Sequence, residues 1–368
     1  MGQPRGAVKI RNGKSRNRKK ASARQRRSFP TTTFMMLPDD LVLNCLARVS
    51  RLCNRNLSLA CKRFRSLLVS TELYQTRALL GCTETCLYVC FNLPNYYRYS
   101  RQKLVTLCRR PNSYRSRKFL LPITCPYRPR TYGSDFARVG SKIYSIGGRR
   151  ITGGEASSSV MVMDCRSHTW SDAPSMLVAR ATPSACVLDG KIYVTGGCEN
   201  LHATNWMEKV CSGFRHQRIQ ALGYDGNVYV KFSEEREVSF YKMEKRRWRA
   251  ADLGMAKGLR PSSSLCVIEN VLYSCTRGRI SWYDSQAKLW KPLEGDLRKL
   301  YDFGRDVTQV ADYGGKLAVL WADYTTVWYL VIALEKRQGG MIWGTIEWVD
   351  AVCAFLDSKV AHLVADTL

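Results

Sequence analysis

The chain has 368 residues, of which 45% are apolar and 24% charged, and its formal net charge is +28. This composition supports a globular core over most of the length. The longest apolar run, Val327 to Leu334, is too short for a membrane-spanning helix, which needs about 20 residues, so we expect no membrane association. The chain has fifteen Cys but no Cys-x-x-Cys pair, and it has only four His. These residues offer little from which to build a zinc site, so we expect no metal and no cofactor.

The cysteines allow two interpretations. Cys82, Cys86 and Cys90 recur every four residues, which would suit a metal-binding helix face. However, residues 86–91 have the composition of a strand, in which such cysteines pack as small buried hydrophobes, and we favour packing. Because we recognise no secretory signal, we expect reduced thiols and a protein of the nucleus, the cytoplasm or both.

Residues 1–30 are predicted to form a basic disordered tail. Residues 1–28 contain eleven Lys or Arg and no acid, and removing them from the net charge of +28 leaves +17 for the rest of the chain. Dense like charge with almost nothing apolar to bury favours disorder. The clusters at 18–20 and 24–27 are consistent with a nuclear import signal, with a nucleic-acid-contacting arm and with a plain solvated tail.

A short helical region is predicted next. The segment Leu37-Pro38-Asp39-Asp40 is typical of a helix start, because proline fits the first turn and acids complement the positive helix end. Leu41, Cys45 and Leu46 then recur at helical spacing, and a second run from Leu57 to Leu68 has the same period. Two or three short helices in so few residues cannot enclose a core of their own. The segment must bury its apolar face on another structure, which implies a partner.

From about residue 130 the pattern changes to strand pairs that repeat. The segment Val139–Gly148 resembles Leu188–Gly197, and weaker copies begin at Tyr224, Ile268 and Tyr313. Each consists of a strand, a short turn such as Asp-Gly, Glu-Asn or Gly-Gly, and a second strand, which is the signature of a β-hairpin. Successive turns are about 50, 36, 44 and 45 residues apart. Repeats of this period indicate a propeller or a solenoid.

A second element follows the hairpins. Met163–Trp170 matches Tyr283–Trp290 position by position, and Tyr241–Trp248 keeps the same offset with Lys242 in place of Asp. This element adds a third strand, a turn and a fourth strand that carries the Trp, which completes a four-stranded blade. We expect the paired glycines to let backbones approach closely near the centre, and the Trp to pack between neighbouring blades.

Together these motifs resemble the plant F-box/kelch-repeat family over about residues 37–350. The segment 37–67 is similar to the F-box, which in that family inserts into the Skp-type adaptor of an SCF (Skp–cullin–F-box) ubiquitin ligase. By position, the resemblance implies an adaptor-docking role for Leu37, Pro38, Leu41, Leu57, Ala60, Cys61 and Phe64.

The resemblance also implies the fold: an α+β, multidomain chain in which a short helical F-box precedes an all-β kelch propeller with one incomplete blade. Strands near 87–91 and 104–107 are expected to form outer strands of a further blade, the partial first one. The implied structural kelch positions are Tyr144, Gly147, Gly148, Trp170, Tyr193, Gly196, Gly197, Trp248 and Trp290. We expect five segments: a basic tail at 1–30, the F-box at 31–80, a linker with a partial first blade at 81–120, the propeller at 121–350, and a C-terminal tail at 351–368.

Two features depart from the family pattern. The second repeat is short, since the Asp-to-Trp hairpin expected after residues 205–208 is missing, and we therefore expect an incomplete blade with exposed strand edges. Ala318 stands where the last hairpin should carry Tyr. The sequence leaves open whether such a propeller closes.

The resemblance implies a substrate receptor that is not itself an enzyme. The F-box would dock the adaptor and through it the cullin, and the propeller would bind a protein that the sequence does not identify. Because ubiquitin transfer then depends on proximity, we expect no catalytic residues. The basic body favours an acidic ligand surface.

Two other functions are less well supported. One is a degenerate kelch scaffold or nuclear interaction protein without ligase activity, which contacts nucleic acid through the basic tail. The body of the chain lacks an aromatic-plus-basic RNA motif, so we do not expect nucleic acid to be the main partner. The other is a copper oxidase, which kelch-type propellers can house. Its ligands should converge, whereas the four histidines fall in unrelated places, namely at His168, His202, His216 and His362.

Overall fold

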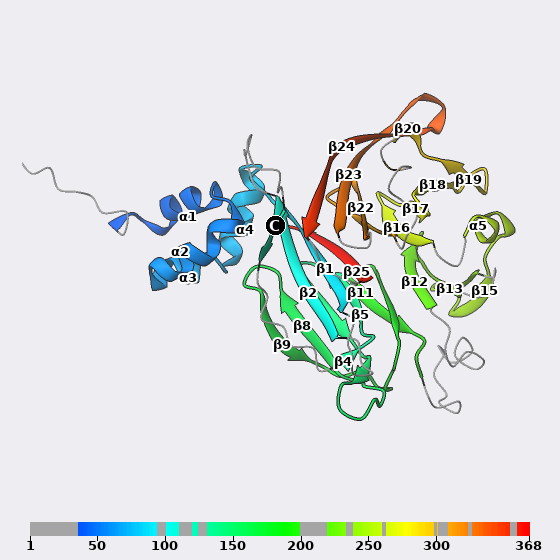
Figure 1. The fold of residues 1–368 in the computed structure, drawn as a ribbon, viewed down its shortest axis with the longest axis horizontal. Coiled ribbons are helices and arrows are strands. Elements are labelled where there is room, and N and C mark those ends of the chain that lie inside the picture. Colours follow the sequence, from blue (N-terminus) through cyan, green and yellow to red (C-terminus); the bar gives the residue numbers. More distant parts are fainter. Residues whose placement is uncertain are drawn as a thin grey trace, which may run out of the picture. The chain divides into compact units, whose positions relative to one another are not determined.

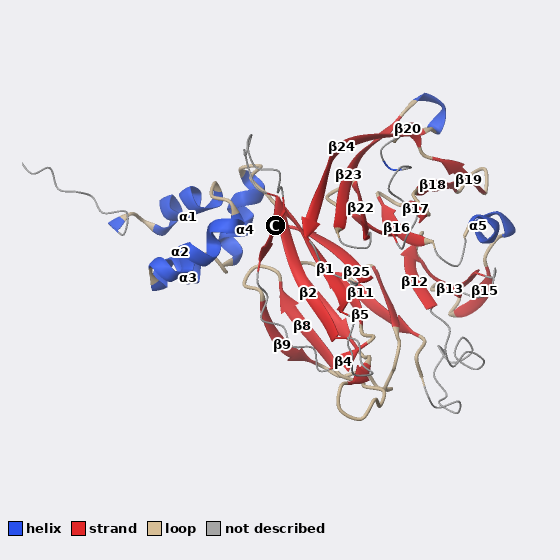
Figure 2. Cartoon of the chain, viewed as in Figure 1, coloured by secondary structure: helices blue, strands red, loops and turns tan. Residues whose placement is uncertain are grey.

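The computed structural model describes residues 36–93, 101–109, 120–123, 131–198, 219–232, 238–259, 263–297, 300, 308–322, 326–353 and 359–368. The chain divides into two compact units, Met1–Val42 and Leu43–Leu368. Helices are confined mainly to the beginning of the described residues, and strands make up most of the rest (Figure 1, Figure 2). The expected basic tail, residues 1–30, lies outside the described residues.

The helical region contains more elements than the two or three that its apolar pattern predicts. Ser50 and Ser70 cap two of them, because their side chains accept hydrogen bonds from the backbone N–H groups of Leu52 and Leu73. The elements are α1 (Asp39–Ala47), the 3₁₀ turn η2 (Arg51–Cys53), α2 (Asn54–Ala60), α3 (Lys62–Leu67) and α4 (Thr71–Leu79).

In the described residues the strands form a propeller of five sheets with four or five strands and two sheets with two strands. We number the five larger sheets and the two-stranded sheet β10–β11 as blades 1 to 6 in chain order. Each four-stranded blade is antiparallel throughout. Blade 1 has the order β25-β1-β2-β3 and consists of β25 (Lys359–Thr367), β1 (Thr85–Leu93), β2 (Arg101–Arg109) and β3 (Leu120–Ile123). Blade 2 consists of β5 (Asp135–Val139), β6 (Lys142–Ile146), β8 (Val160–Asp164) and β9 (Thr169–Ala173), and a small pair lies beside it, β4 (Thr131–Tyr132) with β7 (Arg149–Arg150).

The other blades continue in chain order. Blade 3 is the two-stranded sheet of β10 (Ser184–Leu188) and β11 (Lys191–Thr195). Blade 4 consists of β12 (Ile219–Tyr224), β13 (Asn227–Phe232), β14 (Val238–Lys242) and β15 (Arg247–Ala250), and helix α5 (Leu253–Gly258) follows it. Blade 5 consists of β16 (Ser264–Ile268), β17 (Val271–Thr276), β18 (Arg279–Asp284) and β19 (Leu289–Pro292). Blade 6 consists of β21 (Thr308–Asp312), β22 (Leu317–Ala322), β23 (Val327–Lys336), β24 (Ile342–Cys353) and the parallel strand β20 (Glu294–Asp296).

The predicted hairpins are the first two strands of blades 2 to 6. Their turns have the left-handed backbone that the sequence requires: φ is 46° at Asp225 and 65° at Gly226, and 47° at Glu269 and 56° at Asn270. Two consecutive residues with positive φ give a turn whose twist matches the paired strands. The Asp-Gly and Glu-Asn signals therefore fixed the register of these hairpins.

Among the described residues the innermost strands close a ring. They contact one another in the circular order β25, β5, β10, β12, β16, β21 and back to β25. Three of these junctions carry a link from a side chain at the start of one inner strand to a backbone N–H of the next. Asp135 accepts from Ala185 at 2.6 Å, Ser184 from Ala221 at 2.8 Å, and Ser264 from Val310 at 3.1 Å.

The C-terminal residues differ from the expected arrangement. Residues 351–368 were expected to form a tail, but β24 extends to Cys353 and β25 is the innermost strand of blade 1, beside β1 (Figure 1). Backbone hydrogen bonds join Glu84 and Leu368 in both directions, at 2.8 and 3.2 Å. The expected partial first blade is therefore completed by the other end of the chain, which joins the ring where it would otherwise end.

Candidate adaptor-docking site and propeller surfaces

Helices α2 and α3 present a largely uncovered surface. Neither helix has a buried residue, and Leu59 on α2 is 71% exposed. Five of the eight large hydrophobic side chains that are exposed in the described part of the chain lie between Met36 and Leu79. Exposed apolar side chains gathered in one short segment indicate a contact surface for another molecule.

The structure brings four of the seven adaptor-docking candidates together at the junction of α2 and α3. Leu57 and Ala60 belong to α2, Cys61 joins the two helices, and Phe64 belongs to α3. The Cys61 sulfur accepts a hydrogen bond from the backbone N–H of Phe64 at 3.3 Å, so it caps α3. Ala60 is exposed, whereas the other three are half-buried.

The other three candidates, Leu37, Pro38 and Leu41, lie in the unit Met1–Val42. The Pro38 carbonyl accepts a hydrogen bond from the backbone N–H of Val42 at 3.2 Å, which places the proline at the start of α1 as the sequence predicts. Leu41 is 53% exposed, Pro38 is exposed and Leu37 is half-buried. The docking roles of all seven residues stay predictions.

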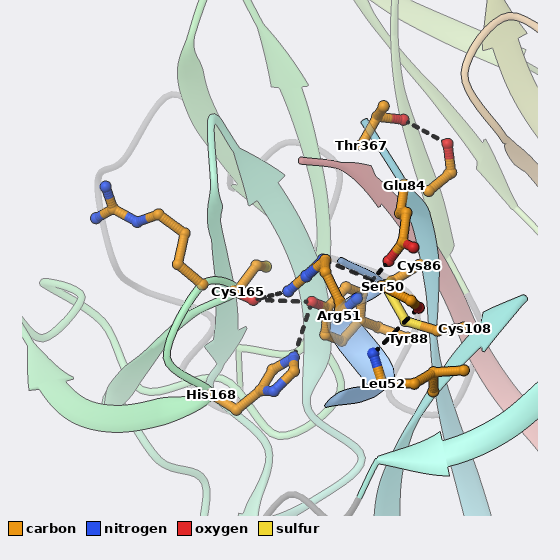
Figure 3. Close-up of a disulfide and its surroundings, with 12 residues drawn as sticks. Ser50, Arg51, Leu52, Glu84, Cys86, Tyr88, Cys108, Cys165, His168 and Thr367 are labelled. Atoms are coloured by element: carbon orange, nitrogen blue, oxygen red, sulfur yellow. Dashed lines mark hydrogen bonds between the residues drawn. A yellow bond between two sulfur atoms is a disulfide. The ribbon is translucent and has the colours of Figure 1, made fainter. Parts of the chain in front are cut away.

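A buried arginine that the sequence analysis missed joins the helical region to the propeller. Arg51 of η2 is only 2% exposed, and Figure 3 shows it between Glu84, Cys86 and Cys165. Its backbone N–H donates to the Glu84 carboxylate at 2.8 Å, and its guanidinium donates to the Cys86 sulfur at 3.2 Å and to the Cys165 carbonyl. One side chain thus contacts blades 1 and 2.

Helix α4 makes further polar contacts around this arginine. The Tyr74 hydroxyl lies 3.3 Å from the Arg166 carbonyl, and the Arg166 guanidinium donates to the Thr71 hydroxyl at 3.0 Å. Arg77, which is 1% exposed, donates to the Val49 carbonyl at 2.6 Å and lies 3.9 Å from the Glu84 carboxylate. We call Arg51, Tyr74, Arg77, Glu84 and Arg166 the helix–blade clamp. It fixes η2 and α4 to the propeller, whereas α2 and α3 have no buried residue and Leu59 of α2 stays exposed.

The turn between β8 and β9, where the clamp attaches, has perturbed ionisable groups. Burial, and after it the positive charge of Arg51, lower the pKa of His168 to about 4, so its ring is neutral near pH 7. The Tyr88 hydroxyl lies 3.2 Å from Nε2 of this ring. Burial opposes ionisation of Asp164, but hydrogen bonds from Arg166 outweigh it and lower the pKa of that carboxyl.

The expectation that all thiols are reduced is wrong for one pair. Cys86 of β1 and Cys108 of β2 form a disulfide (Figure 3). The two residues lie directly opposite each other in the antiparallel register, with Cα atoms 4.7 Å apart, and the sequence showed neither this pairing nor its register. Cys90, on the same strand, is a buried free thiol, as the packing interpretation predicts. Among the described residues no group of His, Cys, Asp and Glu could hold a metal ion.

The paired glycines have the backbone and the crowding expected of them. φ is 60° at Gly147 and 96° at Gly148, and 76° at Gly196 and 71° at Gly197. A Cβ atom on Gly148 would lie 2.8 Å from the Tyr132 carbonyl oxygen, and one on Gly197 would lie 2.7 Å from the Thr182 nitrogen. Glycine is required where another backbone comes this close.

The three repeat tryptophans occupy equivalent places. Trp170, Trp248 and Trp290 each lie opposite a residue of the preceding strand, namely Met163, Tyr241 and Tyr283. Each is partly buried against a cluster with residues of two neighbouring blades. Tyr144 and Tyr193 are half-buried on the second strands of blades 2 and 3. The missing second hairpin of blade 3 falls on residues 199–218, which lie outside the described residues.

The described helices include none that is both long and apolar enough to cross a membrane. A short helical segment followed by a ring of β-blades defines a class of two-part proteins, and comparison with known proteins gives the family. The F-box domain model matches residues 34–76, and the model described as FKB95, Kelch-repeats domain, matches residues 104–353.

Similar proteins of Arabidopsis thaliana agree with this assignment. The chain is 47% identical to the F-box/kelch-repeat protein At4g33900, over 87% of this chain and 91% of that protein. It is 44% identical to the putative F-box/kelch-repeat protein At4g39290 over 90% of this chain and 95% of that protein. It is 45% identical to the putative F-box/kelch-repeat protein At3g43710 over 95% and 97%. The chain belongs to the F-box/kelch-repeat family.

Proposed function

We propose that this chain is the substrate-recognition subunit of an SCF-type ubiquitin ligase. Its F-box docks a Skp-type adaptor, and through it the cullin, while the propeller holds a target protein. The observation that carries this proposal is the junction of α2 and α3, where no residue is buried and Leu59 is 71% exposed, within a segment that the helix–blade clamp ties to the propeller. An adaptor needs an uncovered apolar surface, and a receptor needs that surface firmly joined to its cargo-binding domain.

The chain itself supplies no chemical step in this proposal. Ubiquitin transfer between a ligase-bound carrier and a held target gains from proximity and orientation, which convert an encounter between two molecules into a reaction within one complex. The clamp contributes by limiting movement between the docking helices and the blades, since Arg51 and Arg77 are almost completely buried. Loops between strands, positioned by the rigid blades, are where target contacts are expected.

The proposal is tested by co-purifying the full chain with and without a Skp-type adaptor. We expect a one-to-one complex that Leu37→Ala combined with Phe64→Ala weakens. Leu41→Glu is a second test variant, because this side chain is already 53% exposed and its replacement should not disturb folding. Leu177→Glu is the matched control, since Leu177 is 96% exposed but lies in the propeller region.

A complex that the control variant weakens as much as the F-box variants would contradict docking through the F-box. A folded chain that binds no adaptor would favour the alternative of a kelch scaffold without ligase activity.

We further propose the nucleus, the cytoplasm or both as the compartment of this protein, because of the basic clusters at 18–20 and 24–27. Imaging a fluorescent fusion before and after replacing both clusters by Ser tests their part in import.

A further inference from the structure

The hairpin of β14 and β15 carries the densest positive charge on the described blades. Residues 242–249 contain five cations and one acid within eight positions. The single acid, Glu244, pairs with Lys242 at 3.5 Å and is itself 77% exposed. The other four cations are exposed and have no ion pair among the described residues: Lys245, Arg246, Arg247 and Arg249.

The geometry of the hairpin gathers this charge on one side. Arg247 and Arg249 are two residues apart on β15, so both side chains point to the same face of the strand. Lys242 lies opposite Arg247 in the register and therefore shares that face. Lys245 and Arg246 extend the charge into the turn. Within the described residues β15 is also the outermost strand of its sheet, which leaves these side chains at the rim.

The spacing of the cations suits an extended polypeptide. Side chains two apart on a strand are separated by about 6.8 Å, and the same interval separates alternate side chains of an extended peptide lying alongside. Acidic residues at alternate positions of such a peptide would face Arg247 and Arg249 in turn. Carboxylates also match the planar, bidentate donor pattern of the guanidinium group.

The aromatic residues of the hairpin argue against single-stranded nucleic acid as the ligand. Binding of that kind combines basic side chains with aromatic rings on which bases stack. Here Trp248 lies on the other face of β15, where it packs edge-on against Tyr241 at 5.4 Å. Phe240 shares the face of Arg249, but it is half-buried and stacks on Tyr229 at 5.2 Å. The fully exposed side chains of the hairpin turn and of β15 are mainly the charged ones.

We infer that the β14–β15 hairpin binds an extended acidic segment of the protein that the propeller recruits. The inference rests on the proposed function, because it names the class of substrate that the receptor would hold. It also gives a location to part of the charge of +17 that remains outside residues 1–28, since the five cations and one acid of the hairpin leave a net charge of +4. Cations at such a rim accelerate encounter and select acidic partners.

The test uses the full chain in complex with its Skp-type adaptor and a fluorescein-labelled peptide of alternating Glu and Val that carries a photoreactive group. We expect cross-links within residues 242–250 and an affinity that falls with added salt. Arg247→Thr with Arg249→Thr keeps residues that favour strands and removes two charges. It should weaken peptide binding by about fivefold, since two exposed charge pairs of modest strength are lost.

Arg150→Thr with Arg279→Thr is the matched control, because both residues are exposed cations at strand positions of other blades. An equal loss of binding in this control, or cross-links elsewhere, would overturn the inference. So would a single-stranded oligonucleotide that binds more tightly than the peptide and loses its affinity in the Arg247 and Arg249 variant. Adaptor binding is measured for the same variants. The hairpin substitutions should leave adaptor binding unchanged, and Leu41→Glu should leave peptide binding unchanged. The proposed function and this inference can therefore be contradicted independently of each other.

Discussion

A single methyl group added at Gly148 should destabilise the propeller more than the same group added at Gly153. The two glycines have nearly the same backbone, with φ of 96° and 98°. They differ in their surroundings: a Cβ on Gly148 would lie 2.7 Å from the Ser134 hydroxyl and 2.8 Å from the Tyr132 carbonyl oxygen, whereas a Cβ on Gly153 would meet nothing within 4 Å. Comparing Gly148→Ala with Gly153→Ala therefore separates steric crowding from backbone strain.

The expected sizes follow from these two contributions. Alanine with this backbone costs about 1–2 kcal/mol at either position. Forcing an atom into an occupied space adds about 1–3 kcal/mol at Gly148, and the backbone oxygen of Tyr132 cannot rotate away as a side chain would. Urea unfolding of the full chain measures both, with the slope of the transition checked for constancy. Equal losses of unfolding free energy in the two variants would refute the claim that close backbone approach makes glycine necessary at 148.

Three other perturbations test separate parts of the structure. His168→Asn should flatten the loss of stability on acidification, because the folded pKa of about 4 lies below the ordinary 6.5. The contribution of the neutral ring to the free energy of unfolding, up to about 3 kcal/mol, is complete above pH 6.5 and is lost as pH falls to 4. A wild-type chain with no such loss in this pH window would contradict the assignment. Reducing the Cys86–Cys108 disulfide should lower the free energy of unfolding by about 3 kcal/mol. Reductant should have no effect on the variant in which both cysteines are replaced by Ala. A wild-type stability that does not respond to reductant would contradict the presence of the disulfide. Arg138→Met should lower the free energy of unfolding by about 1–2 kcal/mol, because it removes the guanidinium that lies 2.8 Å from the buried Asp366 carboxylate. Adding Asp366→Asn should recover part of that loss. Strictly additive losses in the two variants would show that the pair is not coupled.

Local signals in the sequence predicted much of this fold. The Asp-Gly and Glu-Asn turns require positive φ at two successive residues, and few sequences other than hairpins meet that requirement. Repetition of the hairpin then indicated a propeller or a solenoid, and the family resemblance implied the propeller. Trp170, Trp248 and Trp290 lie where the repeat placed them. These features depend on residues close together in the chain, so their chemistry is visible without the structure.

Features that depend on distant residues were not visible. The strands β25 and β1 pair although most of the chain separates them in sequence. The sequence of β25 does not show which edge of which sheet the strand will join. Arg51 resembles any other surface arginine in a basic chain until Glu84, Cys86 and Cys165 are placed around it. The docking candidates came from resemblance alone. For those on α2 and α3 the structure adds that none is buried, and no local pattern could have supplied this.

The closed ring also explains how this chain can contain a two-stranded blade 3 in its described residues. Closure depends on the innermost strands, and β10 keeps its full set of inner contacts: its Ala185 N–H binds Asp135, and its Ser184 side chain binds the Ala221 N–H. The Asp135 carboxylate also lies 2.8 Å from His362 on β25, so one acidic side chain joins the inner strands of blades 1, 2 and 3. Outer strands are not needed for this closure, and they are free to differ between blades. The clamp attaches at the turn between the third and fourth strands of blade 2, and the basic hairpin is the corresponding turn of blade 4. Inner strands therefore maintain the ring, while turns between outer strands hold the clamp in blade 2 and the proposed peptide-binding hairpin in blade 4.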